Sequence, residues 1–188
     1  MFRFKGVAPE NVFERMPDLR GKLIHVSFRP MLTAYQGKLL SKSHKGDAVY
    51  AGSFLRKRRI VLEEQMLKTP RVLERIFVHE VFHFVWSKAS RTLRESYECL
   101  LLNEIAEAWP GELGWSAECL KIKLGDEDLE TRSRRWKDYI CESFCDTAGW
   151  YFGTARRYSE MTLGGQARRE RVRWLHENIL GRQRPLAI

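Results

Sequence analysis

The chain has 188 residues, a length typical of one domain. Its composition is 44% hydrophobic, 12% aromatic and 30% charged, which excludes a disordered or low-complexity chain. Lys and Arg (33) outnumber Asp and Glu (24), so the net charge is +9, which is compatible with acidic partners without identifying one. The sequence shows neither a membrane-spanning apolar run nor a secretory signal, and its four cysteines are dispersed. We therefore expect a soluble, cytoplasmic protein with reduced thiols and no membrane association.

The first 70 residues have the patterns of strands and turns. Short apolar runs predict β-strands at 23–28, 48–55 and 58–64, and turn-forming residues occupy 41–47. From the Thr69-Pro70 pair, which is typical of a helix start, an unbroken run predicts a helix to about residue 88.

Helical spacing then dominates the rest of the chain. Further helices are predicted at 90–109, 116–123, 133–153 and 166–180, with a solvated turn at 125–130. Strands first and helices afterwards predict a single α+β domain over residues 1–188.

The segment His79-Glu80-Val81-Phe82-His83 has the pattern H-E-x-x-H. Residues four apart on a helix project from one face, so both imidazoles can bind one tetrahedral Zn²⁺. Glu80 lies 100° around the helix, where its carboxylate can take a proton from a water. The flanking residues are apolar, and buried polar groups need a partner that a metal would supply. The structural alternative is a pair of core histidines bonded to backbone, with a chance glutamate.

The third ligand must come from elsewhere in the chain. Trp86 and Ala89 stand where the metzincin extension requires Gly and His, and no histidine lies between His83 and His176. A glutamate remains, and two are candidates. Glu104 lies in a leucine-rich helix with acidic neighbours that suggest a solvated edge, and we favour the other, Glu142.

The predicted helix at 133–153 carries polar residues on one face of an otherwise apolar surface. At 100° per residue, Tyr139, Glu142, Asp146 and Gly149 share that face. Glu142 would bind the metal, Asp146 would orient a ligand histidine through its ring N–H, and Gly149 would let another backbone approach. The structural alternative pairs these carboxylates with nearby basic residues, namely Arg134, Arg135 and Lys137.

The pattern H-E-V-F-H, followed by Glu142-Ser-Phe-Cys-Asp146, resembles the gluzincin branch of the zincin metallopeptidases. The resemblance covers 70–88 and about 136–150. It implies zinc held by His79, His83 and Glu142, with Glu80 as general base and Asp146 supporting a ligand histidine.

The same resemblance implies a zincin-like fold, with a small N-terminal sheet and a mostly helical part around a buried metal-binding helix. It also implies that an edge strand upstream of that helix pairs with an extended peptide or protein substrate, which here points to 58–64 or the strand before it. A donor must steady the developing oxyanion. By residue type the candidates are Tyr139, Tyr151, Tyr158 and His176, and Tyr139 ranks first because it shares the face of Glu142.

Cys141 and Cys145, four apart beside Glu142, could add thiolate ligands or form a second site with Cys99 or Cys119. A structural zinc site prefers close pairs such as C-x-x-C, which the sequence lacks. We therefore favour the interpretation that these cysteines act as small, buried hydrophobic residues.

Basic residues gather at 56–59 and at 156–184, where eight Arg stand against three Glu. Such runs usually form a solvated face, and nucleic-acid binding is the sharper interpretation, although no recognised motif accompanies the charge. Two functions therefore stand. One is a zinc-dependent hydrolase of the metallopeptidase type. The other is a non-catalytic, zinc-containing binding or regulatory module, for which the basic surface offers nucleic acid as one candidate partner. Glu80 favours the enzyme, because a structural zinc site has no need of that carboxylate.

Overall fold

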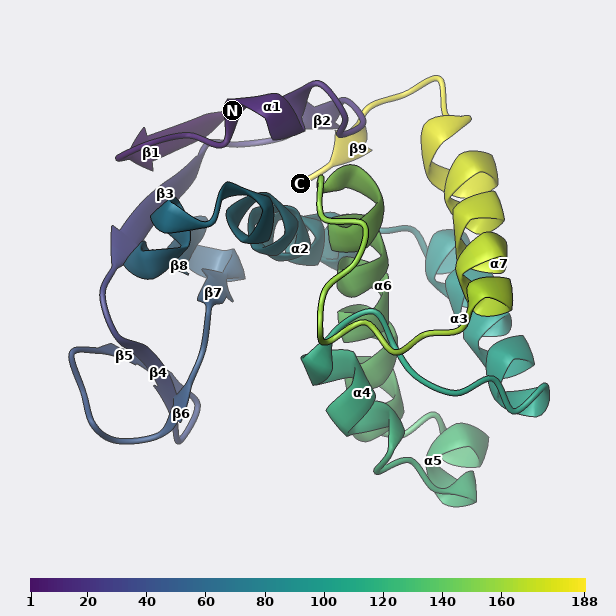
Figure 1. Ribbon diagram of the computed structural model, residues 1–188. Coiled ribbons are helices and arrows are strands. Elements are labelled where there is room, and N and C mark those ends of the chain that lie inside the picture. The colour runs from purple at the N-terminus through teal and green to yellow at the C-terminus, as the bar shows by residue number, and fades with distance from the viewer.

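The structure is a computed structural model that describes the backbone of residues 1–188 and every side chain except that of Glu10. Strands predominate in the N-terminal third and helices in the remainder, so the predicted α+β class is confirmed (Figure 1). The strands are β1 (Phe2–Lys5), β2 (Leu19–Arg20), β3 (Ile24–Arg29), β4 (Leu32–Tyr35), β5 (Lys38–Ser41), β6 (Asp47–Ala48), β7 (Ala51–Phe54), β8 (Arg59–Glu63) and β9 (Leu186–Ala187).

The helices begin with α1 (Glu10–Phe13) and then follow one another from residue 70. They are α2 (Pro70–Lys88), α3 (Arg91–Ala106), α4 (Trp115–Lys121), α5 (Asp126–Thr131), α6 (Arg134–Phe152) and α7 (Gly165–Leu175). Short 3-10 turns η1 (Leu55–Lys57) and η2 (Glu64–Lys68) flank β8, and the π-helical turn η3 (His176–Leu180) extends α7.

The main sheet has the order β1-β3-β8-β7. Strands β1, β3 and β8 run parallel, whereas β7 pairs antiparallel with β8, with Ala51 opposite Leu62 and Phe54 opposite Arg59. Strand β7 therefore stands at the edge of the sheet. Because β8 lies in the middle, Ile60, Val61 and Leu62 are buried.

The strand predicted at 48–55 is two strands in different sheets. Residues Asp47–Ala48 form β6, which joins β4 and β5 in a three-stranded sheet, and only Ala51–Phe54 enters the main sheet as β7. The β4–β5 hairpin was not predicted. Its turn places Gln36 and Gly37 at positive φ (47° and 71°), the conformation of a tight two-residue hairpin.

Helix α2 starts after Thr69 and ends at Lys88, as the sequence predicts. The caps at the starts of α3 and α6 are side-chain hydroxyls: Ser90 accepts from the Leu93 N–H at 3.2 Å, and Ser133 from the Trp136 N–H at 3.3 Å. The solvated turn predicted at 125–130 is wrong, because Asp126–Thr131 is helix α5. Its first turn is acidic, which favours a helix N-terminus, and the Asp128 carboxylate accepts the Gly125 N–H at 3.1 Å.

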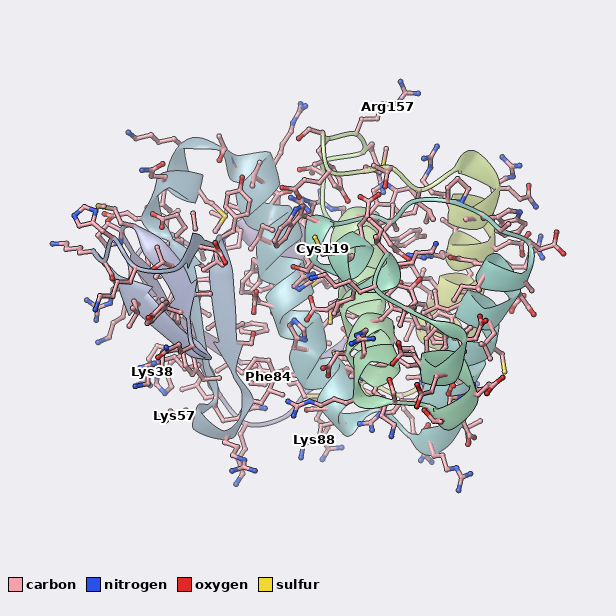
Figure 2. All side chains as sticks on the ribbon, turned by 90° about the horizontal axis from the view of Figure 1, so that it is seen from below. Lys38, Lys57, Phe84, Lys88, Cys119 and Arg157 are labelled. Atoms are coloured by element: carbon pink, nitrogen blue, oxygen red, sulfur yellow. The ribbon has the colours of Figure 1, made fainter. Side chains whose placement is uncertain are left out.

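The hydrophobic core runs from the main sheet through α2 to α6, and α3 and α7 cover the far side of α6 (Figure 1). Close packing of α2 on α6 needs small residues at the crossing. A Cβ added at Gly149 would lie 2.9 Å from the Arg75 carbonyl oxygen, so Gly149 lets another backbone approach, as predicted. Charged side chains such as Lys38 and Arg157 extend outward on opposite sides of the molecule (Figure 2). Among the described residues, no helix is both long and apolar enough to cross a membrane.

Candidate metal centre

Helices α2 and α6 bring His79, His83 and Glu142 together in space. His79 and His83 follow each other at i, i+4 on α2, and their Nε2 atoms are 3.1 Å apart. The Glu142 carboxylate faces both rings from α6, with its oxygens 3.4 Å from His79 Nε2 and 3.7 Å from His83 Nε2. Together these residues form one potential metal-binding group, called the triad below.

The donor set of the triad fits zinc. Two imidazole nitrogens and one carboxylate oxygen are the ligands of many catalytic zinc sites, which keep a fourth position open. Bonds of about 2.1 Å in a tetrahedron place ligand atoms about 3.4 Å apart. The three separations in the triad, 3.1, 3.4 and 3.7 Å, bracket that spacing.

Asp146 lies one turn beyond Glu142 and holds the far side of the His79 ring. Its Oδ1 is 2.8 Å from His79 Nδ1, and the residue is 6% exposed. With the Nδ1 proton donated to this carboxylate, the lone pair of Nε2 faces the other two triad residues. Burial disfavours the imidazolium, yet the carboxylates of Asp146 and Glu142 raise the pKa of His79 well above its usual value.

The second oxygen of Asp146 packs against the backbone at the start of α4. A Cβ added at Gly114 would lie 2.3 Å from Asp146 Oδ2, so only glycine fits there. Among the described side chains, Asp146 Oδ2 is buried without a hydrogen-bond partner.

The Glu80 carboxylate contacts the edge strand β7. The Glu80 side chain is almost fully buried, and Oε2 accepts a hydrogen bond from Ser53 Oγ of β7 at 2.5 Å. The same hydroxyl lies 3.0 Å from the Glu80 carbonyl oxygen. Sequence reasoning missed Ser53, because nothing in the local pattern of β7 shows which helix residue faces it.

Two adjoining cavities open beside these residues. One, of about 360 Å³, lies between β7 and the triad, and its lining includes Gly52, Ser53, Glu80 and Ser116. The other, of about 380 Å³, shares His79, Glu80 and Ser116 with the first and extends to Trp115 of α4. The triad is therefore reachable from the side of the edge strand.

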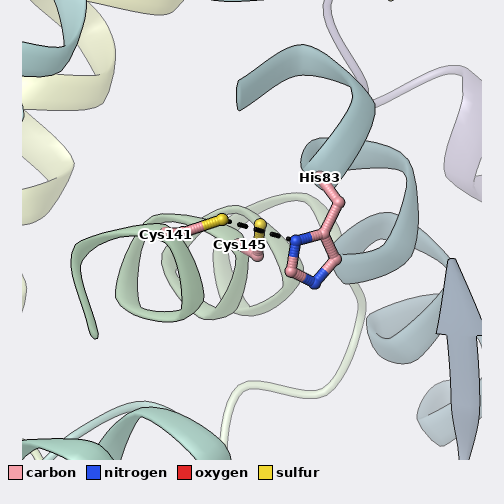
Figure 3. Close-up of side chains that lie close together, drawn as sticks. All are labelled: His83, Cys141 and Cys145. Atoms are coloured by element: carbon pink, nitrogen blue, oxygen red, sulfur yellow. Dashed lines mark hydrogen bonds between the residues drawn. The ribbon is translucent and has the colours of Figure 1, made fainter. Parts of the chain in front are cut away.

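His83 has a second neighbour on its other ring nitrogen. Cys141 Sγ lies 3.5 Å from His83 Nδ1, and Cys145 Sγ lies next to both (Figure 3). The hydrogen bond with Cys145 and the nearby His83 lower the pKa of Cys141 to about 6, against burial. Burial and the Cys141 thiol raise the pKa of Cys145 well above its usual value. The four cysteines are free thiols.

The structure does not bring Tyr139 to the triad, although it shares α6 with Glu142. Tyr139 is 0% exposed, and its hydroxyl donates to Glu112 Oε1 at 2.5 Å. The hydroxyl that was predicted to steady an oxyanion is therefore committed to a buried carboxylate. The face was assigned by helix angle alone, which does not show where a long side chain ends.

The other predicted donors are also engaged elsewhere. The Tyr151 hydroxyl lies 2.8 Å from His176 Nε2, and the Tyr158 hydroxyl donates to the Leu113 carbonyl at 2.5 Å. Ser116 lines both cavities, and no sequence pattern singles it out.

Glu104 belongs to a separate buried cluster, and the prediction that it lies on a solvated edge is wrong. Glu104 and Arg171 are each 0% exposed and form two hydrogen bonds, at 2.8 and 2.7 Å. Arg171 also donates twice to Glu112, each time at 2.8 Å. One of the eight arginines of the basic C-terminal segment is therefore turned into the core.

Comparison of the chain with protein-family models, curated proteins and solved structures finds no match.

Proposed function

We propose that the protein is a zinc-dependent metallopeptidase whose metal is held by His79, His83 and Glu142. One observation carries the proposal. Two imidazole Nε2 atoms and a carboxylate from a facing helix converge, next to a glutamate whose carboxylate is hydrogen-bonded to an edge strand.

The donor set favours zinc over the hard cations. Mg²⁺ and Ca²⁺ prefer oxygen ligands, whereas imidazole and carboxylate together suit Zn²⁺. When bound, zinc supplies two effects: it lowers the pKa of a water toward 7 and polarises a carbonyl oxygen.

The residues around the metal position have distinct tasks. Asp146 accepts the Nδ1 proton of His79 and so keeps that ring oriented with its free Nε2 toward the centre. Glu80 takes a proton from the attacking water and passes it to the leaving amine. Ser53 holds the Glu80 carboxylate in place through one of its oxygens, which leaves the other free for the proton.

The proposed substrate is an extended peptide segment. Strand β7 stands at the edge of the main sheet, and its residues Ala51, Gly52 and Ser53 line the cavity that contains the triad. A peptide pairing with this edge would pass alongside His79 and Glu80. Such pairing reads backbone groups and tolerates many side chains.

The second function from the sequence, a non-catalytic module, differs in one respect. It needs the triad but has no use for a carboxylate at Glu80 next to a cavity. The Glu80 geometry therefore favours the enzyme.

The test is cleavage of a broad peptide library by zinc-loaded protein, with a chelator control. Wild type should cleave and lose activity in chelator, while Glu80→Gln should keep its zinc and fold and lose about 10²–10⁴ in rate. Glu130→Gln, on an exposed residue of α5, is the matched control and should cleave like wild type. Zinc-loaded wild type that cleaves nothing, or Glu80→Gln that cleaves equally well, contradicts the proposal.

A further inference from the structure

The imidazole of His83 stands between two groups of potential ligands. Its Nε2 belongs to the triad, while its Nδ1 faces two thiols on α6. Nδ1, Cys141 Sγ and Cys145 Sγ all lie within 4.8 Å of one another. We infer that Cys141, Cys145 and His83 Nδ1 form a second metal site, which takes a thiophilic divalent cation such as Zn²⁺ or Cd²⁺. This site goes beyond the proposed peptidase function and does not depend on turnover.

The backbone arrangement suits such a site. Cys141 and Cys145 are four apart on α6, so both thiols project from one face on successive turns. His83 approaches from the facing helix α2, which packs tightly on α6 through Gly149. The three ligands therefore come from two rigid elements, and Figure 3 shows the thiols and the imidazole directed toward one another.

The observed spacing agrees with zinc coordination. Bonds of about 2.3 Å to sulfur and 2.1 Å to nitrogen place S and N about 3.6 Å apart in a tetrahedron. Cys141 Sγ and His83 Nδ1 are 3.5 Å apart. Two thiolates and one imidazole form a soft donor set, which selects thiophilic ions and rejects Mg²⁺ and Ca²⁺.

The site is enclosed on one side and open on the other. Cys145 is buried, while Cys141 and His83 are half-buried, so an ion can enter past Cys141. Both thiols are free, and neither is committed to a disulfide. Three protein ligands leave a fourth position for water or another small ligand.

Sharing His83 couples this site to the triad. The ring must give up both N–H protons to hold an ion on each nitrogen, and two cations across one ring repel each other. Occupancy of either site therefore weakens binding at the other by the same factor. Excess thiophilic metal bound at the second site would thus oppose metal binding at the triad.

The test uses Cd²⁺ as the probe, since bound thiolate gives it an ultraviolet charge-transfer absorption that nitrogen and oxygen ligands do not. Full-length protein freed of metal is titrated with Cd²⁺. Wild type should show this absorption at the amplitude of one thiolate-bound Cd²⁺ per chain, and Cys141→Ser/Cys145→Ala should abolish it. Cys99→Ser/Cys119→Ser, which changes the other two thiols, should leave it intact.

The single variant Cys141→Ser guards against misfolding, because Cys141 is half-buried and serine keeps its size. With unchanged circular dichroism, it should weaken Cd²⁺ binding at least tenfold. No absorption in wild type, or equal absorption in the Cys141→Ser/Cys145→Ala protein, overturns the second site. Glu142→Gln separates the two proposals. This variant should lose zinc at the triad but keep the thiolate absorption of Cd²⁺. If the triad binds no zinc in any variant, the thiolate absorption should still appear.

Discussion

Replacing Asp146 by asparagine tests how the histidine ligands are held. Asp146 is 6% exposed, and its Oδ1 lies 2.8 Å from His79 Nδ1, so the pair forms a buried, charge-assisted hydrogen bond. Such bonds are roughly twice as strong as neutral ones, which are worth about 1 kcal/mol. An amide keeps the shape but loses the charge. It can also donate to Nδ1, which would move the ring proton to Nε2 and block ligation.

We therefore expect Asp146→Asn to weaken zinc binding by about 10–100-fold, the usual cost of losing such a partner. This corresponds to about 1.4–2.7 kcal/mol. The assay is competition for zinc against a chromophoric chelator, with thermal unfolding measured in parallel. Asp138→Asn is the control, since Asp138 lies on the same helix, is exposed and forms an i, i+4 ion pair with Arg134 at 3.6 Å. Equal zinc affinity in the Asp146→Asn protein and wild type would refute this reasoning.

Two further predictions concern packing and charge. Gly149→Ala places a Cβ 2.9 Å from the Arg75 carbonyl oxygen. This variant should lower the free energy of unfolding by about 1–3 kcal/mol and weaken zinc binding. Gly165→Ala should do neither, because its added Cβ would meet flexible guanidinium groups of Arg168 and Arg169 at 3.7 and 3.6 Å. Denaturant midpoints and the zinc assay check this pair, and equal stability of the two variants would contradict it. Although burial opposes ionisation, the Arg171 guanidinium lowers the pKa of Glu112. The ionised carboxylate therefore stabilises the fold at pH values above its unfolded-state pKa of about 4.3. That stabilisation is lost as the pH falls toward the lower, folded-state pKa. The stability difference between wild type and Glu112→Gln should therefore shrink on acidification from pH 7 to pH 3, and a difference independent of pH would count against the buried ion pair.

Local periodicity accounts for what could be predicted of the site. His79 and His83 share a face because they are four apart on a helix, and the same angular argument placed Glu142 and Asp146 together. Gly149 was predicted to admit another backbone because it interrupts a face of larger residues. Each of these inferences concerns the positions of residues within one helix, which sequence spacing determines.

Contacts between distant segments could not be predicted in this way. Arg171 pairs with Glu104 across 67 residues, so the residues adjacent to either one in the sequence do not indicate the pair. The Tyr139 hydroxyl reaches Glu112, which lies in the segment before α4. His83 meets Cys141 only because α2 and α6 pack closely, and the usual C-x-x-C pattern gave no signal for it.

We propose that His79, His83 and Glu142 bind zinc. The most direct measurement is elemental analysis of the Cys141→Ser/Cys145→Ala protein after loading with zinc and gel filtration. Of the two metal-binding groups found among the described side chains, this protein keeps the triad. We predict one zinc per chain, retained when Glu104→Gln is added and lost when Glu142→Gln is added. A folded protein without zinc, or zinc that survives Glu142→Gln and departs with Glu104→Gln, would contradict the account.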